Sequence, residues 1–143
     1  MDCVDMEIFE ILERNGRISH EEIAEILHLS RPAIHRRIAK LEMEGIITGY
    51  RALIDWRKVR PCIRCLIFLK INGGYFAQIA KEIVNMEIAG VVIEECHRLA
   101  GEWCVLVKTR ISAPEDTTKI LDRVWQLNGI IETSTTFVID TVI

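Results

Sequence analysis

The stretch from residue 18 to residue 49 constrains the fold more than any other part of this 143-residue chain, because it marks two short helices and the turn between them. Ser19 and Glu22 have the spacing of a capping box, in which each side chain bonds to the other's backbone N–H at the start of a helix. Ser30 has the side chain of a second N-cap, and Gly45 is a residue type that often ends a helix. Two capped helices this close together predict a helix-turn-helix.

The second helix of the pair is expected to have one apolar face and one basic face. Ile34, Ile38 and Leu41 share a face at spacings of four and three residues, so they should pack into a core. The opposite face points outward, and a helix presented in this way can enter the major groove of duplex DNA. The residues expected nearest the bases are Pro32, Ala33, His35 and Arg36. The residues expected at phosphates are Arg31, Arg37 and Lys40.

Charge is unevenly distributed along the chain. Residues 1–29 contain two Lys/Arg against eight Asp/Glu, and residues 30–60 contain eight against three, although the whole chain has a formal charge of −3. A positive block on an acidic chain favours double-stranded DNA as a partner, and Arg36 is the best candidate for a guanine contact. The alternative is a solvated basic face on an ordinary core helix.

The composition favours a folded cytoplasmic protein, since half of the residues are hydrophobic. We expect no membrane span and no signal peptide. Five cysteines are an odd number, and in a reducing compartment most of them are expected to be buried thiols. Cys62 and Cys65 form a lone C-x-x-C pair at the start of an expected strand, where their side chains would point to opposite faces, so a zinc or redox site is the less favoured interpretation. We expect neither a metal nor a cofactor.

The chain is expected to divide into three parts. Residues 1–50 would form the DNA-binding domain, a winged-helix-like head whose third helix covers residues 4–14. Residues 51–61 form a charged hinge or linker, and residues 62–143 form a second domain for ligand sensing and oligomerisation. The β-branched content of residues 46–54 predicts a strand between the helices and the linker.

The second domain is expected to alternate strands and helices, because its apolar residues switch between a period of two and a helical period. The expected elements are a strand over 62–71, a helix over 76–86, strands over 91–97 and 103–111, a helix from 114, and a strand over 131–143. In the third strand Trp103, Val105 and Val107 would share one face. The order is that of the βαββαβ or ferredoxin-like unit, so the predicted fold class is α+β.

Two helices can cover only one face of such a sheet. Leu66 and Phe68 are apolar and would face away from Ile67 and Leu69, so the uncovered face is also apolar in places. Something must bury it, and the same sheet in a second copy of the chain is the simplest partner. We therefore expect a homodimer.

Three segments in this order resemble the Lrp/AsnC family of leucine-responsive, or feast/famine, regulators. They are LSRPAIHRRIAKLEMEGIITGYRA (29–52), ECHRLAGEWCVLVKTR (95–110) and LNGIIETSTTFVI (127–139). The resemblance covers nearly the whole chain. It implies a sequence-specific transcriptional regulator with a DNA-binding head, a hinge strand and a ligand-sensing domain. It also implies dimers that assemble further, commonly into octamers, and small-molecule effectors, often amino acids, bound between dimers.

The resemblance implies an effector site at the turn between the second and third strands of the sheet. Family members often have Gly-Asp-x-Asp there, and this chain has Gly101-Glu102-Trp103-Cys104. Glu102 keeps an acceptor for a ligand ammonium group, whereas Cys104 replaces the second carboxylate with a neutral thiol. Trp103 could narrow a pocket, and Thr135 in the last strand could lend a hydroxyl. The alternative is that Gly101 serves only a positive φ, Glu102 is only solvated and Thr135 reflects β propensity.

Two other classes of function remain open at this point. An enzyme resembling the sirohaem decarboxylases could use the same scaffold, but the sequence offers no nucleophile–base pair, metal spacing or phosphate loop. Cys96 and His97 are adjacent in a strand and point to opposite faces, which argues against a shared metal ion. A ligand-sensing partner that does not bind DNA would have no use for the basic helix. We therefore expect a regulator that is not an enzyme.

Overall fold

The computed structural model describes residues 1–140 and divides the chain into two compact units, Met1–Ile54 and Asp55–Ile143. The division falls inside the range expected to be the hinge. None of the helices in the part of the chain that the structure describes is long and apolar enough to cross a membrane.

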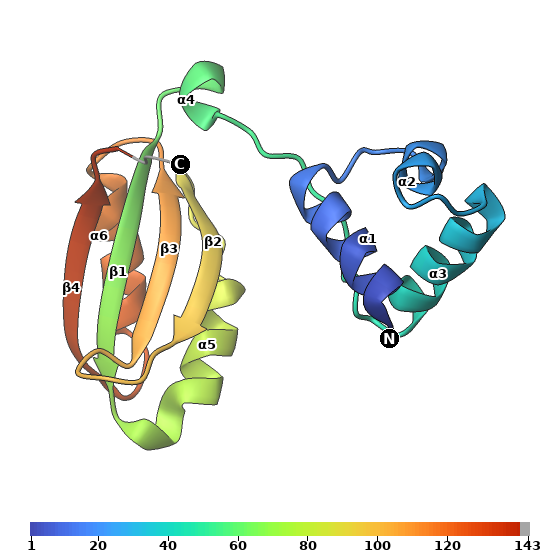
Figure 1. Ribbon diagram of the computed structural model, residues 1–143. Coiled ribbons are helices and arrows are strands. Elements are labelled where there is room, and N and C mark those ends of the chain that lie inside the picture. Colours follow the sequence, from blue (N-terminus) through green and yellow to red (C-terminus); the bar gives the residue numbers. More distant parts are fainter. Residues whose placement is uncertain (141–143) are drawn as a thin grey trace. The chain divides into compact units, whose positions relative to one another are not determined.

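The first unit contains three helices, α1 (Cys3–Arg14), α2 (His20–Ile26) and α3 (Arg31–Met43), as expected (Figure 1). Each of the first two begins with a capping box, and the one at α2 is the predicted pair of Ser19 and Glu22. The helices meet around the fully buried side chains of Ile8, Ile23 and Ile34. Burying an isoleucine side chain contributes about 1.5–3 kcal/mol, so a few such residues can hold this small head together.

The two ends of α3 differ in how they are capped. Ser30 has the extended backbone of an N-cap, with Pro32 in the first turn, but its side chain makes no capping hydrogen bond. Gly45 follows the helix with φ of 69°, the left-handed conformation expected of a glycine at this position. The length of α3 is therefore fixed mainly by Pro32 and Gly45.

The strand predicted over residues 46–54 is not formed, and that prediction was wrong. Ile47 packs against the core of the first unit, and the rest of the segment reaches α4 (Trp56–Val59) without regular structure. A strand requires a neighbouring strand to pair with its backbone groups. The structure describes all of residues 1–54 and shows no strand there, so the β-branched sequence lacks a partner within its own unit.

The second unit is the predicted α+β sheet domain, which Figure 1 shows with both long helices on one face. Its elements are β1 (Ile63–Ile71), the short 3₁₀ helix η1 (Gly73–Tyr75), α5 (Phe76–Val84), β2 (Val91–Arg98), β3 (Val105–Ile111), α6 (Asp116–Trp125) and β4 (Ile130–Val138). The strands lie in the order β2-β3-β1-β4, and every neighbouring pair is antiparallel. The βαββαβ, ferredoxin-like topology is thus confirmed.

Two strand boundaries differ from the prediction. The last strand ends at Val138, and the remainder of the strand expected to reach residue 143 includes 141–143, which lie outside the described residues. The third strand begins at Val105, so Trp103 is not part of it. The predicted alternation of Trp103 with Val105 and Val107 therefore fails, with a consequence for the effector turn described below.

The core of the second unit lies between the sheet and its two helices. Alternate residues of β1, namely Cys65, Ile67 and Leu69, are fully buried against Ile79 of α5 and Ile120 of α6. The residues between them in β1 lie on the face that neither helix covers. We call this the open face. Its apolar members include the half-buried Leu66, Phe68 and Leu106.

Candidate DNA-binding and effector sites

The outward surface of α3 carries nearly all of the residues predicted to contact DNA. Ile34, Ile38 and Leu41 are buried, which turns the opposite side of the helix to solvent. The exposed candidates are Arg31, Pro32, His35, Arg36 and Lys40, and Ala33 is half-buried. All of these side chains except Lys40 lie in the N-terminal half of the helix, which is the part that a recognition helix presents to base edges.

Arg37 differs from the other candidates because it is paired inside the unit. Its Nη1 donates to Asp2 Oδ2 at 2.8 Å and to Asp5 Oδ1 at 2.7 Å, and only a third of its side chain is exposed. These contacts raise the pKa of Arg37. The pKa of the Asp2 carboxyl is lowered mainly by the backbone N–H of Asp5, and that of the Asp5 carboxyl mainly by the backbone N–H of Asp2. The hydrogen bonds from Arg37 lower both values further. The structure therefore places Arg37 in a link between α1 and α3, and not among the freely available cations.

The other basic residues of α3 are only weakly paired. Arg31 lies 4.0 Å from Glu21 and Lys40 lies 3.8 Å from Glu44, and all four side chains are largely exposed. Exposed ion pairs of this kind contribute little free energy, so these cations are available to other anions. His35 contacts the ring of His20, with 5.3 Å between centroids. His20 is a neighbour of the candidate surface that the sequence pattern did not indicate.

The predicted effector turn is built around Lys70 of β1. Lys70 Nζ donates to Glu102 Oε1 at 2.8 Å and to Glu132 Oε2 at 2.7 Å, and it lies 4.8 Å from the ring centroid of Trp103. The Glu102 and Glu132 carboxylates raise the pKa of Lys70 to about 12, and Lys70 lowers the pKa of Glu102. Glu102 is therefore an ion-pair partner and not merely solvated. Lys70 and Glu132 were not among the predicted site residues.

The structure brings together only part of the predicted effector set. Trp103 lies beside Phe68, with 6.2 Å between ring centroids, and so belongs to the open face with Glu102. Cys104 packs against the core, and its N–H donates to the Leu69 carbonyl at 2.9 Å. Thr135 is opposite the buried Ile67 in the sheet, on the helix-covered face. Within one chain, Cys104 and Thr135 therefore do not share a surface with Glu102.

Gly101 allows the turn to change direction. Its φ is 149°, and a Cβ added there would meet no atom within 4 Å. The backbone conformation, and not the available space, is thus what favours glycine at this position. The alternation of β3 breaks between Cys104 and Val105, because both of these side chains pack against the core.

A second ionic cluster lies on the open face between β2 and β3. Glu95 Oε2 accepts from Lys108 Nζ at 2.9 Å and lies 2.7 Å from His97 Nε2. These two contacts lower the pKa of Glu95 to about 2. Cys96 packs against the core while His97 is exposed, so the two point to opposite faces, as their adjacency in the strand predicts. No group of three metal-ligating side chains is found among residues 1–140.

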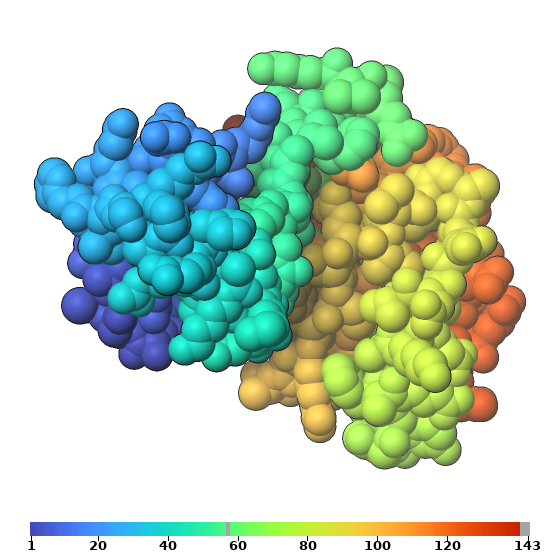
Figure 2. Space-filling view, turned by 90° about the vertical axis from the view of Figure 1, so that its right-hand side faces the viewer, coloured from blue at the N-terminus to red at the C-terminus, as the bar shows by residue number. Residues whose placement is uncertain are grey.

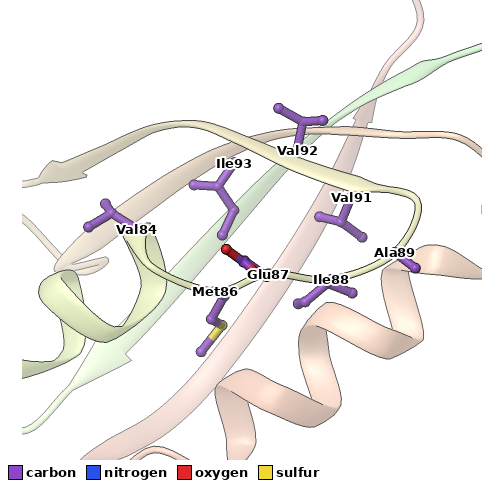
Figure 3. A pocket seen from close by; sticks show the side chains of 8 residues that line it. All are labelled: Val84, Met86, Glu87, Ile88, Ala89, Val91, Val92 and Ile93. Carbon is purple, nitrogen blue, oxygen red and sulfur yellow. The ribbon is translucent and has the colours of Figure 1, made fainter.

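Two hollows of the second unit lie away from the effector turn. Figure 3 shows the first, of about 510 Å³, beside the segment that leads from α5 into β2. Its lining side chains are apolar except for that of Glu87. A lining of this kind suits neither DNA nor a zwitterion. The second, of about 260 Å³, is lined in part by Arg60 and Arg110. Both lie where β2 begins, whereas the effector turn follows its end.

Comparison with known proteins agrees with both units. Residues 1–42 match the model of the AsnC-type helix-turn-helix domain, and residues 64–143 match that of the Lrp/AsnC ligand binding domain. The chain is 28% identical over 139 residues to the HTH-type transcriptional regulator FL11 of Pyrococcus furiosus, covering 97% of this chain and 89% of that one. It is 29% identical over 146 residues to the leucine-responsive regulatory protein of Haemophilus influenzae, covering 99% and 86%.

A solved structure shows the same fold over the whole length. The transcriptional regulator of Neisseria meningitidis, in its complex with L-Met, superposes with a TM-score of 0.80 and 24% identity, over 99% of this chain and 92% of that one. The resemblance seen in the sequence is thus confirmed. The chain belongs to the Lrp/AsnC family of DNA-binding transcriptional regulators, with an AsnC-type helix-turn-helix domain followed by an Lrp/AsnC ligand-binding domain.

Proposed function

We propose that α3 reads operator sequence in the major groove, with Arg36 as the principal base contact. The observation that supports this is the exposure of Arg36 on the outward side of α3, without the internal carboxylates that hold Arg37. Pro32, Ala33 and His35 lie toward the same end of the helix. Arg31 and Lys40 are the proposed phosphate contacts, which position the head without reading sequence.

Replacing Arg36 with alanine tests this proposal. A bidentate arginine–guanine contact discriminates by about 1–3 kcal/mol, so Arg36→Ala should lower the ratio of operator to random-DNA affinity by roughly 5- to 150-fold. Fluorescence anisotropy with both duplexes measures the ratio, and Arg14→Ala, an exposed arginine on α1, is the matched control. An equal loss of affinity for both duplexes would make Arg36 a phosphate contact and refute the assignment.

We infer that the effector is a small molecule of the amino-acid class, bound at the turn that contains Gly101, Glu102 and Trp103. The carboxylates of Glu102 and Glu132 share one lysine, so this cluster keeps one net negative charge that attracts an ammonium group. The neisserial neighbour, whose structure is a complex with L-Met, supports an amino acid as ligand. Cys104 and Thr135 lie on the other face within one chain, so a contribution from them would require a second chain.

Glu102→Gln removes the carboxylate but keeps the shape of the side chain. We expect it to weaken any stabilisation by L-methionine or L-leucine in a thermal-shift assay while leaving DNA affinity in the absence of ligand unchanged. Glu115→Gln, at an exposed position before α6, is the control for loss of charge. A ligand response that is equal in Glu102→Gln and the native protein would place the effector elsewhere.

We also propose that the open face is buried in a homodimer, and that dimers assemble further, to an octamer or a similar size. The half-buried Leu66, Phe68 and Leu106 support this, because neither helix covers them. Two heads in a symmetric dimer would read half-sites about 34 Å apart, or a multiple of that distance. Light scattering with Phe68→Asp tests the proposed dimer interface, and a mass equal to that of the native protein would refute it.

We place this regulator in the cytoplasm and do not assign it an enzymatic activity, in keeping with its relatives' names.

A further inference from the structure

Two arginines share the ring of one tryptophan where the sheet meets α4. The guanidinium carbon of Arg110, at the end of β3, lies 3.9 Å from the ring centroid of Trp56. That of Arg60, just after α4, lies 5.7 Å from the same ring. Figure 1 shows α4 at the end of the sheet where β1 begins and β3 ends, and Figure 2 shows the same green segment at the top of the view. A ring that attracts two cations concentrates positive charge at this end of the sheet.

The Arg110 side chain is buried and incompletely paired. The residue is 8% exposed, and its Nη1 lies 3.2 Å from Glu94 Oε1. Its Nε is buried and has no hydrogen-bond partner among the described residues. A buried donor attached to a charged group is costly to leave unpaired. Nε and the neighbouring Nη2 form one edge of the guanidinium, a fork that matches the two oxygens of a carboxylate or phosphate.

The two arginines line a cavity large enough for more than a single ion. Its volume is about 260 Å³, several times the ≈30 Å³ that a water molecule occupies in the liquid. Its lining also includes Cys62, Val92 and Ser112, and it contains no carboxylate among the residues that the structure describes. With Glu94 counted against Arg110, the lining residues still carry the positive charge of Arg60. They favour an anion and offer nothing to an ammonium group.

We propose that this cavity binds a small organic anion through its carboxylate or phosphate group, which pairs with Arg60 and with the incompletely paired guanidinium of Arg110. The site is distinct from the effector turn, because it lies where β2 begins and the turn follows where β2 ends. The two sites also favour ligand groups of opposite charge, because Glu102 at the turn suits an ammonium group and the two arginines of this cavity suit an anion. The proposal does not depend on the function proposed for that turn.

Isothermal titration of the full chain, in a buffer of low ionic strength, tests the site. The probes are inorganic phosphate and the unbranched carboxylates from acetate to glutarate. Arg60→Gln is the first variant because Arg60 is exposed and its loss should not disturb folding. Arg110→Gln is the second. Arg98→Gln is the matched control, since Arg98 is exposed and also lies over an aromatic ring, that of Phe76, at the other end of β2.

We expect saturable binding of at least one probe, weakened about tenfold or more in Arg60→Gln and in Arg110→Gln and unchanged in Arg98→Gln. The preferred probe identifies the group as phosphate or carboxylate. Glu102→Gln should bind the same probe with native affinity, which separates this site from the effector turn. The absence of saturable binding for every probe, or equal weakening in Arg60→Gln and Arg98→Gln, would overturn the proposal.

Discussion

Replacing Lys40 with glutamine should make DNA binding less sensitive to salt, whereas the same replacement of Arg37 should not. Binding releases counterions in proportion to the phosphates neutralised, and log K falls with log salt by about 0.9 per phosphate. The structure leaves Arg31, Arg36 and Lys40 available on α3 and holds Arg37 between two carboxylates. With Arg36 at a base, Arg31 and Lys40 of two heads neutralise four phosphates, which gives a slope of about −3.5.

The predicted changes in slope follow from the same count. Lys40→Gln removes one cation from each of two heads and should move the slope to about −2, and Arg37→Gln should leave it near −3.5. If Arg37 were also a phosphate contact, the native slope would be about −5, and Arg37→Gln would change it as much as Lys40→Gln does. Anisotropy of a labelled duplex between about 50 and 200 mM KCl resolves these values.

A complementary variant guards against a misfolded Arg37→Gln. The double change Asp2→Asn and Asp5→Asn removes both partners and frees the guanidinium, so the slope should steepen by up to about 2 for two heads. Circular dichroism and thermal melting establish that each variant is folded. Equal flattening of the slope by Arg37→Gln and Lys40→Gln, in folded proteins, would refute the reasoning.

Two further predictions concern the second unit. Gly90 has φ of 84°, and a Cβ added there would lie 2.5 Å from Asp116 Oδ2. Gly90→Ala should therefore lower the free energy of unfolding in urea by about 1–3 kcal/mol more than Gly101→Ala, where the space is open. Equal losses in the two variants would show that Asp116 moves aside freely. Lys108 and His97 lower the pKa of Glu95 from its ordinary value of 4.5 to about 2. The ionised Glu95 therefore adds to the free energy of unfolding above pH 4.5, and this contribution is lost as the pH falls toward 2. Unfolding free energies between about pH 5 and pH 3 should therefore fall more steeply in the native protein than in Glu95→Gln, and parallel curves would contradict this.

Patterns that depend on near neighbours in the chain predicted the elements well. The capping box of Ser19 and Glu22 and the alternation through Ile67 and Leu69 each lie within one element, and both are formed as expected. The strand over 46–54 failed because a strand also needs a neighbour, which the sequence of that segment does not encode.

The predicted site residues fared unevenly for a related reason. Exposure on α3 follows from helical periodicity, so the outward direction of Arg36 could be deduced. The partners of Arg37 and Glu102 could not, because Asp2 and Lys70 are 35 and 32 positions away along the chain. Trp103 was assigned to a strand face by extending the alternation of β3 beyond Val105, where the strand begins. Such contacts depend on how elements pack, and packing is not a local property.

The same two carboxylates bond both to the first turn of α1 and to Arg37, a basic residue of α3. Asp2 and Asp5 accept each other's backbone N–H at the helix start and also hold Arg37. A polyanion that competes for the Arg37 guanidinium would therefore remove a contact from the start of α1, and opening of that end would in turn release Arg37 to the polyanion. By reciprocity the two events are linked with the same free energy, so an amide-exchange rate at the start of α1 reports on what binds to α3.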